Sequence, residues 1–248
     1  EISANINRTS EVLQSQKFQL KKKETARANW IAGVSHDIRT PLSMVMGFAG
    51  QLENDTALSE SEHKKAAAIR RQSERIRNLI NDLNLASKLE YNMQPVTIKP
   101  ESVIAIVRQV VADFINTDID GKFPMEWDTD ENASAYFVNA DKELLKRAVS
   151  NLIQNCINHN EKGCSVFVSV HAEQNCCAVC VEDNGIGISD EQIEKLNNTP
   201  HYMVCDTNTT EQRHGLGLLI VKQIAASHHG TLTISHSSHG GFAAKILL

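Results

Sequence analysis

Large apolar residues recur at intervals of seven between about residues 60 and 91, and this spacing constrains the fold more than any other feature of the sequence. Ile69, Ile76 and Leu83 form the series. A strict heptad over a helix requires knobs-into-holes packing against a neighbouring helix. Residues 24–54 carry a second amphipathic helical pattern, and only a short turn-rich stretch separates the two segments. The two segments are therefore expected to form an antiparallel helical hairpin.

One such hairpin cannot bury both of its apolar faces, so two copies are expected to pair in a four-helix bundle. This reasoning predicts a homodimer. Residues 1–23 are polar and helical in character, with apolar residues at loosely heptad-like positions, and are expected to form a coiled-coil lead-in. The hairpin itself, residues 24–91, is the all-α part of the predicted architecture.

Short strand-like and helix-like segments alternate after Tyr91, which predicts a second domain over residues 92–248. Strands that come in pairs with helices between them indicate an α+β sandwich, with the helices on one face of a mixed sheet. Strands are expected at 95–98, 123–128, 135–139, 164–171, 176–183, 231–236 and 242–248, and helices at 101–115, 141–159 and 215–228.

Composition and charge argue against several classes of protein. The formal net charge is −5 and no sustained basic face is present, which argues against nucleic-acid binding. No apolar run approaches the ~18 residues that a membrane-spanning helix needs. Because the sequence begins with Glu1 rather than Met, we expect a fragment of a longer protein, attached to a membrane only through segments absent from this chain.

Three of the six cysteines, Cys176, Cys177 and Cys180, lie close together in a strand-like segment. A metal site is disfavoured because no second pair of ligands stands at a matching spacing. Cysteine in a strand behaves as a small buried apolar residue. We therefore expect reduced, buried thiols, as in a cytosolic protein.

A histidine with an adjacent carboxylate stands in the first helical segment. His36 is followed by Asp37, and Thr40 lies one turn further along on the face of His36. Pro41 removes one backbone hydrogen bond and is expected to kink the helix. His36 is expected to point outward, because a separate apolar stripe is expected to face the core: Ile31, Val34, Ile38, Leu42 and Val45.

Two polar segments of the second domain indicate a nucleotide site. Asn151 and Asn155 share one helical face, where carboxamides can bind a hard cation and phosphate oxygens; the alternative is a solvated polar face. Asp183 follows a strand and precedes Gly185 and Gly187, glycines that permit positive φ and a close approach of a ligand. The carboxylate can accept from the exocyclic amino group of adenine, and the alternative is a tight Asx turn.

Gly215 and Gly217 stand at the start of the helix expected at 215–228. Glycines at a helix N-terminus leave backbone N–H groups and the positive end of the dipole open to phosphate; the alternative is a simple helix breaker. The segment is neither a Walker A loop nor a dinucleotide-binding fingerprint, because Gly-Lys-Ser/Thr and a third glycine are both missing.

Taken together and in this order, these segments resemble the H box, the N box and the two glycine boxes of the sensor histidine kinases of two-component systems. The resemblance covers about residues 24–248. It implies a HisKA-type dimerisation and phosphoacceptor domain, followed by a GHKL-type ATP-binding domain of the fold shared with gyrase and heat-shock chaperones. The residues that match the H box are Ser35-His36-Asp37-Ile38-Arg39-Thr40-Pro41.

The resemblance implies a role for each matching residue. His36 would accept the phosphoryl group, Asp37 would act as general base, and Thr40 would orient water to dephosphorylate the regulator. ATP and Mg²⁺ are the implied cofactors, with Asn155 as the Mg²⁺ ligand. The other residues implied to contact the nucleotide are Asn151, His159, Asp183, Gly185, Gly187, Gly215 and Gly217.

The sequence departs from the family pattern before the second glycine box. The nearest match to the aromatic F box is 201–204, which lacks phenylalanine, and Asn158 stands where the N box commonly has a basic residue. Lys162 or Arg213 could supply the missing positive charge. The polar stretch 199–214 is expected to be a mobile lid. Either the kinase is slow, or this lid works through Arg213.

The resemblance implies a bacterial protein-histidine kinase that phosphorylates itself on His36 and transfers the group to an aspartate of a response regulator. It also implies the cytoplasmic portion of an inner-membrane sensor. Two alternatives stay open. A degenerate kinase could serve as a dimeric signalling scaffold, which the weak F box favours. An ATPase of the same fold could hydrolyse ATP without a phosphohistidine, but such ATPases lack a hairpin that carries a residue like His36.

Overall fold

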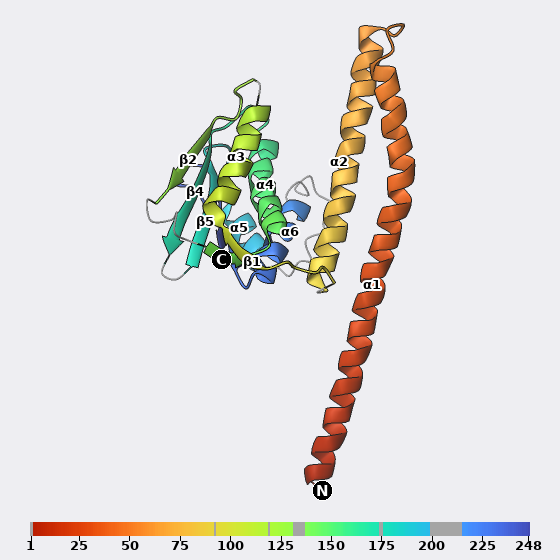
Figure 1. The fold of residues 1–248 in the computed structure, drawn as a ribbon, viewed down its shortest axis with the longest axis vertical. Coiled ribbons are helices and arrows are strands. Elements are labelled where there is room, and N and C mark those ends of the chain that lie inside the picture. Colours follow the sequence, from red (N-terminus) through yellow and green to blue (C-terminus); the bar gives the residue numbers. More distant parts are fainter. Residues whose placement is uncertain (1, 92, 119, 131–136, 174–175, 199–214) are drawn as a thin grey trace. The chain divides into compact units, whose positions relative to one another are not determined.

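The computed structural model describes residues 2–91, 93–118, 120–130, 137–173, 176–198 and 215–248 (Figure 1). The chain divides into two units, Glu1–Gln94 and Pro95–Leu248. The first unit is a pair of helices, and the second is a sheet with helices on one face. In the part of the chain that the structure describes, no helix has the length and apolar content to cross a membrane.

The two helices of the first unit are α1, Ile2–Glu53, and α2, Glu60–Glu90. Pro41 lies inside α1, and the helix continues past it to Glu53. Residues 1–23, which we expected to be a separate lead-in, are the first part of this same helix from Ile2 onward. A single long helix thus carries both the lead-in and the histidine segment.

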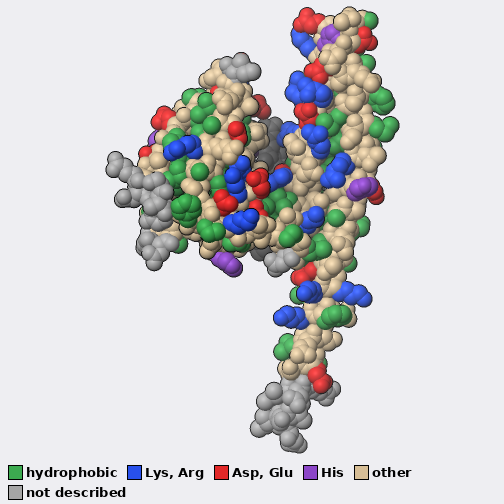
Figure 2. Space-filling view, in the orientation of Figure 1, with side chains coloured by type: hydrophobic (Ala, Val, Ile, Leu, Met, Phe, Trp, Pro, Cys, Tyr) green, Lys and Arg blue, Asp and Glu red, His purple; other side chains and the backbone are tan. Residues whose placement is uncertain are grey.

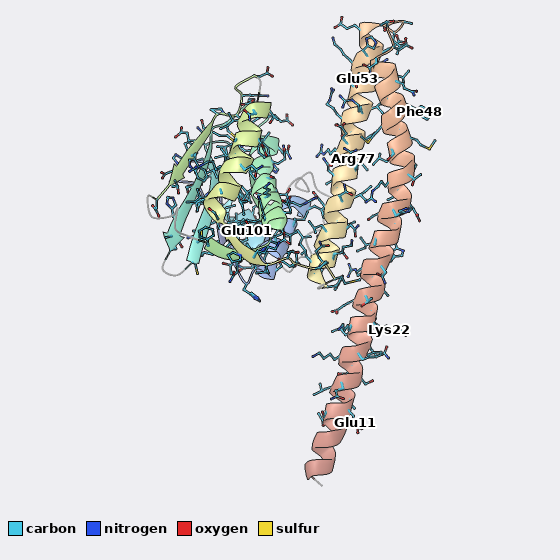
Figure 3. The ribbon with its side chains drawn as sticks, viewed as in Figure 1. Glu11, Lys22, Phe48, Glu53, Arg77 and Glu101 are labelled. Carbon is cyan, nitrogen blue, oxygen red and sulfur yellow. The ribbon has the colours of Figure 1, made fainter. Side chains whose placement is uncertain are left out.

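Local hydrogen bonds fix the turn between α1 and α2. The Ser59 hydroxyl accepts from the Glu62 N–H, and the Glu62 carboxylate accepts from the Ser59 N–H at 2.8 Å, which forms a capping box at the start of α2. Glu53, at the end of α1 near the turn (Figure 3), forms an ion pair with Arg70 of α2. These contacts connect the two helices at the closed end of the hairpin.

Small residues pack α1 against α2. Ser35 is 2% exposed, although it lies beside an exposed histidine. Small side chains at a helix interface allow the two backbones to approach closely. The buried residues at sevenfold spacing are Ala28, Ser35, Leu42 and Ala49 on α1, and Ala66, Ser73 and Ser87 on α2.

The apolar stripe that we expected to face the core is largely exposed in the single chain, so it is not the face through which the two helices of one hairpin pack together. Val34, Ile38 and Val45 keep 36–43% of their surface accessible, and Leu42 alone of the stripe is buried. The physical reason is that the hairpin has two apolar faces and closes through the one with smaller side chains. The other face is exposed in the single chain, and on α2 it includes the heptad residues Ile69, Ile76 and Leu83. Figure 2 shows apolar side chains among charged ones on the surface of the hairpin.

The second unit contains a five-stranded sheet of strand order β2-β4-β5-β7-β6. β2 pairs in parallel with β4, and the remaining neighbours are antiparallel. β1 and β3 form a separate antiparallel ribbon. The strands are β1 Lys99–Ser102, β2 Met125–Thr129, β3 Phe137–Ala140, β4 Val166–Glu173, β5 Cys176–Asp183, β6 Thr231–His236 and β7 Phe242–Leu247.

Helices cover one face of this sheet (Figure 1). Along β4, Val166, Val168 and Val170 are buried while the alternate residues Phe167 and Ser169 are partly exposed, as expected for a sheet that is covered on one side. The α+β sandwich predicted from the sequence is therefore confirmed. The helices of this unit are α3 Val103–Thr117, α4 Lys142–His159, α5 Asp190–Asn198 and α6 Gly215–Ser227.

Two local predictions differ from the structure. The strand expected at 95–98 is instead β1 at Lys99–Ser102, because the Thr97 N–H donates to the Asp141 carboxylate at 2.8 Å rather than to a strand. The sequence did not indicate α5, because this helix is short and mostly polar and none of its residues is buried. Both errors come from segments whose positions depend on contacts distant in the sequence.

The five described cysteines are all free thiols. Cys156, Cys164 and Cys177 are buried as expected, but Cys180 is only half-buried and Cys176 is exposed. Among the described residues, no group of three or more His, Cys, Asp or Glu side chains could hold a metal ion. Burial raises the pKa of Cys177 from 9.0 to about 11, so this thiol stays neutral at physiological pH.

The raised thiol pKa predicts a loss of stability at alkaline pH. The unfolded chain releases the Cys177 proton near pH 9, whereas the folded chain keeps it to about pH 11. Cys177 should therefore leave the free energy of unfolding unaffected below pH 9 and should contribute about 1 kcal/mol to its fall between pH 9 and 11, after allowance for solvent screening and in addition to the contributions of the other buried thiols. Urea unfolding at pH 8, 9, 10 and 11 measures this slope.

The neighbouring cysteine supplies the control. Cys177→Ala should reduce the alkaline loss most, whereas Cys176→Ala, which removes the smaller electrostatic contribution to the raised pKa of Cys177, should reduce it less. An equal pH slope in Cys177→Ala and in the parent would contradict the assignment.

Candidate functional site

His36 is displayed on the surface of α1 with its carboxylate neighbour. The His36 and Asp37 side chains are 76% and 84% exposed, and the His36 Nδ1 lies 3.3 Å from the Asp37 Oδ1. An ionised carboxylate only accepts hydrogen bonds, so the proton of the neutral imidazole belongs on Nδ1. The Nε2 lone pair is thereby left free for reaction. The prediction that His36 points outward is confirmed.

Residues on either side of His36 fix this stretch of helix. The Ser35 hydroxyl donates to the Ile31 carbonyl at 2.7 Å and is buried in the hairpin, and Arg39 donates to the Asn81 Oδ1 of α2 at 3.1 Å. These contacts set the rotation of α1, which places His36 on the solvent side. Thr40 is also exposed, one turn beyond His36.

Asp141, the N-cap of α4, forms hydrogen bonds with its own helix and with two other segments of the chain. The Asp141 Oδ1 accepts from the N–H groups of Glu143 and Leu144, and its Oδ2 accepts from the Thr97 N–H. The Asp141 N–H itself donates to the Nε2 of His228, a buried histidine that follows α6. This cap fixes the helix that carries both asparagines of the proposed nucleotide site.

Asn151 and Asn155 lie one turn apart on α4, and the helix rotation is set by Leu152 and Ile153, which are fully buried. The Asn151 Nδ2 is buried and has no hydrogen-bond partner among the described residues. A buried amide without a partner calls for an explanation, and a bound phosphate oxygen or metal-bound water would supply one. Together with the Asn155 side-chain oxygen, this donor set fits a nucleotide with Mg²⁺.

Asp183 ends β5 and is 2% exposed. Its Oδ1 accepts from the N–H groups of Gly185 at 2.8 Å and Phe242 at 3.3 Å. Two backbone donors at one oxygen hold the carboxylate in a fixed orientation. The Asp183 carboxylate is therefore a rigid hydrogen-bond acceptor at the C-terminal end of a central strand.

The two glycines after Asp183 are required for different reasons. Gly187 has φ +68°, a conformation that side chains rarely adopt. Gly185 is not in that region; a Cβ there would instead lie 1.8 Å from the Oδ1 of Asn160. Of the two expected reasons for these glycines, positive φ applies to Gly187, and at Gly185 the close neighbour is the side chain of Asn160.

Sequence reasoning missed two residues of this site, Asn160 and Gly241. Asn160 is buried against the Asp183–Gly187 turn, and a Cβ on Gly241 would lie 2.2 Å from the Asp183 Oδ1. The Gly240-Gly241 pair before the last strand was a signal that could have been used. No sequence signal identified Asn160, because its hydrogen-bond partner in the turn lies far away along the chain.

Two buried thiols lie next to Asp183. Burial first, and the Asp183 charge second, raise the pKa of Cys156 well above its usual value and that of Cys164 to about 11. Both thiols are therefore neutral at physiological pH. They add no second negative charge beside the carboxylate.

The structure describes some of the remaining predicted site residues. His159 ends α4 and is half-buried. Gly215 begins α6, and a Cβ added to Gly217 of the same helix would meet no described atom within 4 Å. Lys162 is exposed in the loop after α4. Arg213, the F-box candidate 201–204 and the proposed lid 199–214 lie outside the described residues.

Two family models match the chain. Residues 26–92 match the His Kinase A (phospho-acceptor) domain, and residues 140–248 match the histidine kinase-, DNA gyrase B- and HSP90-like ATPase. The first match contains His36, and the second contains the whole of α4, Asp183 and both glycine pairs. The two matches thus cover the hairpin and most of the second unit.

The whole of this chain is similar to parts of known kinases. It is 30% identical over 249 residues to the sensor histidine kinase YvrG of Bacillus subtilis (strain 168), and the aligned region covers all of this chain and 42% of that protein. It is 28% identical over 252 residues to sporulation kinase B of the same organism, and this aligned region covers all of this chain and 54% of that protein. The chain therefore spans about half the length of these relatives.

A solved structure shows the same fold. Full-length ShkA in complex with AMPPNP aligns with a TM-score of 0.68 at 21% identity, over 88% of this chain and 44% of that chain. With a phosphoacceptor hairpin at residues 26–92 and an ATPase domain at residues 140–248, the chain belongs to the sensor histidine kinases of two-component systems.

Proposed function

We propose that this chain transfers the γ-phosphoryl group of ATP to His36 and then to an aspartate of a response regulator. The observation that carries the proposal is the arrangement at His36, where Nδ1 faces the Asp37 carboxylate and the side chain is 76% exposed. This leaves Nε2 accessible on a chain that also contains an ATPase domain. The plain ATPase alternative accounts for neither the His36–Asp37 pair nor the hairpin, and a dimeric scaffold would need the hairpin but not the His36–Asp37 pair.

The chemistry follows from the tautomer. The Nε2 lone pair of His36 attacks the γ-phosphorus as the bond from that phosphorus to the β,γ-bridging oxygen breaks, and ADP leaves with the electron pair. Asp37 hydrogen-bonds to the Nδ1 proton and stabilises the positive charge that develops on the ring. In the second half-reaction the P–N bond breaks, and the phosphoryl group passes to an aspartate oxygen of the regulator.

The nucleotide would be held by the second unit. Asp183 would accept from the adenine amino group, and the N–H groups at the start of α6 would bind phosphate beside Gly215 and Gly217. Asn155, with Asn151 beside it, would hold Mg²⁺, which neutralises phosphate charge when bound. The unpartnered Nδ2 of Asn151 supports this placement. His159, Gly185 and Gly187 would complete the nucleotide contacts, and Arg213 would add positive charge.

Two further parts of the proposal concern partners. The exposed apolar face of the hairpin, which includes Ile69, Ile76 and Leu83, is proposed to pack against a second copy in a four-helix bundle. Thr40, exposed one turn from His36, is proposed to orient water when the chain dephosphorylates its regulator.

Because the relatives named above are about twice as long, we propose that this chain is the cytoplasmic kinase portion of a longer sensor.

A labelling experiment tests the phosphoacceptor. Incubation with γ-labelled ATP and Mg²⁺ should give an acid-labile, base-stable label on the parent, and His36→Gln should abolish it because no other nitrogen is proposed to react. The control His63→Gln, on α2 beside the turn, should keep the label. Bound ATP without label in the parent would favour the scaffold, and ATP hydrolysis without label would favour the plain ATPase.

Gly217→Ala separates nucleotide binding from folding. A Cβ at Gly217 meets no described atom within 4 Å, so stability should be unchanged or should rise by about 0.5–1 kcal/mol. Affinity for ATP, measured by calorimetric titration, should fall at least about tenfold, because the methyl group occupies the space where phosphate approaches.

Gly47→Ala is the matched control for this substitution, since the added Cβ also meets nothing within 4 Å but lies on α1. It should affect stability in the same direction and leave ATP affinity unchanged. Equal ATP affinity in Gly217→Ala and the parent would argue against a phosphate site at the start of α6.

Disruption of the exposed apolar face should produce monomers. Ile76 is 45% exposed in the single chain, and Ile76→Glu would bury a charge in the proposed bundle, which is strongly unfavourable. Sedimentation velocity should show a dimer for the parent and a predominantly monomeric Ile76→Glu. Asn78→Glu adds the same charge at a nearby exposed position and should remain dimeric. A monomeric parent would contradict the bundle.

A further inference from the structure

Asn160 uses both ends of its side chain to connect two parts of the proposed nucleotide site. It lies at the C-terminal cap of α4 and is only 5% exposed. Its Nδ2 donates to the Cys156 carbonyl at 2.8 Å, and its Oδ1 accepts from the Ile186 N–H at 3.0 Å. A carbonyl needs a donor and an N–H needs an acceptor, so only one orientation of the amide satisfies both.

The turn after Asp183 is fitted around this side chain. A Cβ on Gly185 would lie 1.8 Å from the Asn160 Oδ1, 2.3 Å from its Cγ and 2.5 Å from its Nδ2. No real Cβ approaches heavy atoms that closely, so the amide group of Asn160 occupies the space that a side chain at position 185 would need. Glycine at position 185 and asparagine at position 160 therefore depend on each other, because the Asn160 amide fills the space beside Gly185.

Two successive N–H groups of this turn are fixed in different ways. The Gly185 N–H donates to Asp183, and the next N–H, that of Ile186, donates to Asn160. The first bond holds the turn to its own strand, and the second holds it to α4. The Cys156 thiol of α4 also forms a side-chain hydrogen bond with the Asp183 carboxylate, and Asn160 adds the contact that reaches the backbone of the turn itself.

We infer that Asn160 is a positioning residue that holds the Asp183–Gly187 turn in fixed register with α4. It keeps the carboxylate proposed to bind adenine at a set distance from the asparagines proposed to bind phosphate and Mg²⁺. The inference rests on the proposed role of these residues in ATP binding. Asn160 acts through the Ile186 N–H and the space at Gly185, without itself touching the nucleotide.

A double-mutant cycle on the full chain tests the packing part of this inference without nucleotide. Gly185→Ala should lower the thermal midpoint of the second unit by about 5 °C in the parent, because the new methyl group collides with the Asn160 amide. In an Asn160→Ala background that space is vacant, so the same substitution should change the midpoint by about 1 °C or less. Equal losses in the two backgrounds would overturn the inference.

Nucleotide titration tests the functional part. Asn160→Ala should raise the dissociation constant for ATP and the KM for ATP about tenfold, while the labelling rate at saturating ATP stays within about twofold of the parent. Hydrogen exchange at the Ile186 amide should also become faster, a local effect that general destabilisation would not confine to this turn. Asn139→Ala, at an exposed position of β3 outside the proposed site, should change none of these quantities.

The failures can be told apart. Faster exchange at Ile186 with unchanged ATP affinity would overturn the positioning role and leave the proposed function intact. A parent chain that binds no ATP would contradict the proposed function itself, whereas the stability cycle would still report on the contact between Asn160 and Gly185.

Discussion

The buried carboxylate of Asp183 is the constraint on which the second unit depends. A charged group that is 2% exposed is unfavourable unless its oxygens are hydrogen-bonded, and here one oxygen accepts from two backbone N–H groups, those of Gly185 and Phe242. Two chain segments must therefore approach the same oxygen. This explains the glycine at 241, where a Cβ would lie 2.2 Å from that oxygen. The position of β7 beside β5 and the shape of the turn after β5 follow from the same requirement.

The parts of the fold that the sequence predicts are those with local periodicity. β5 and β6 have the residue ranges expected from the sequence, 176–183 and 231–236, because runs of strand-forming residues are bounded there by polar or glycine-rich turns. α4 ends at His159 as expected and begins one residue after the expected start at 141, because Asp141 is its N-cap. The exposure of His36 was also predictable, because a polar residue in an amphipathic helix lies away from the apolar positions.

The parts of the fold that the sequence does not predict depend on contacts between residues that are far apart along the chain. The sequence of α1 contains two apolar faces, and periodicity alone did not show that the small residues around Ser35 would be buried while Val34 and Ile38 stayed exposed. Asn160 and the Ile186 N–H are 26 positions apart, and Asp183 and Phe242 are 59 apart. Such pairs are brought together only by the topology of the sheet, so no local pattern could identify them.

The central claim is that Nε2 of His36 is the nucleophile, because Nδ1 faces Asp37 at 3.3 Å. Nuclear magnetic resonance of the phosphorylated chain, with histidine labelled by ¹⁵N at its ring nitrogens, tests this most directly. The account predicts phosphorus–nitrogen coupling to Nε2 of one histidine and its loss in His36→Gln. Coupling to Nδ1 of His36, or phosphate on a different residue, would contradict it.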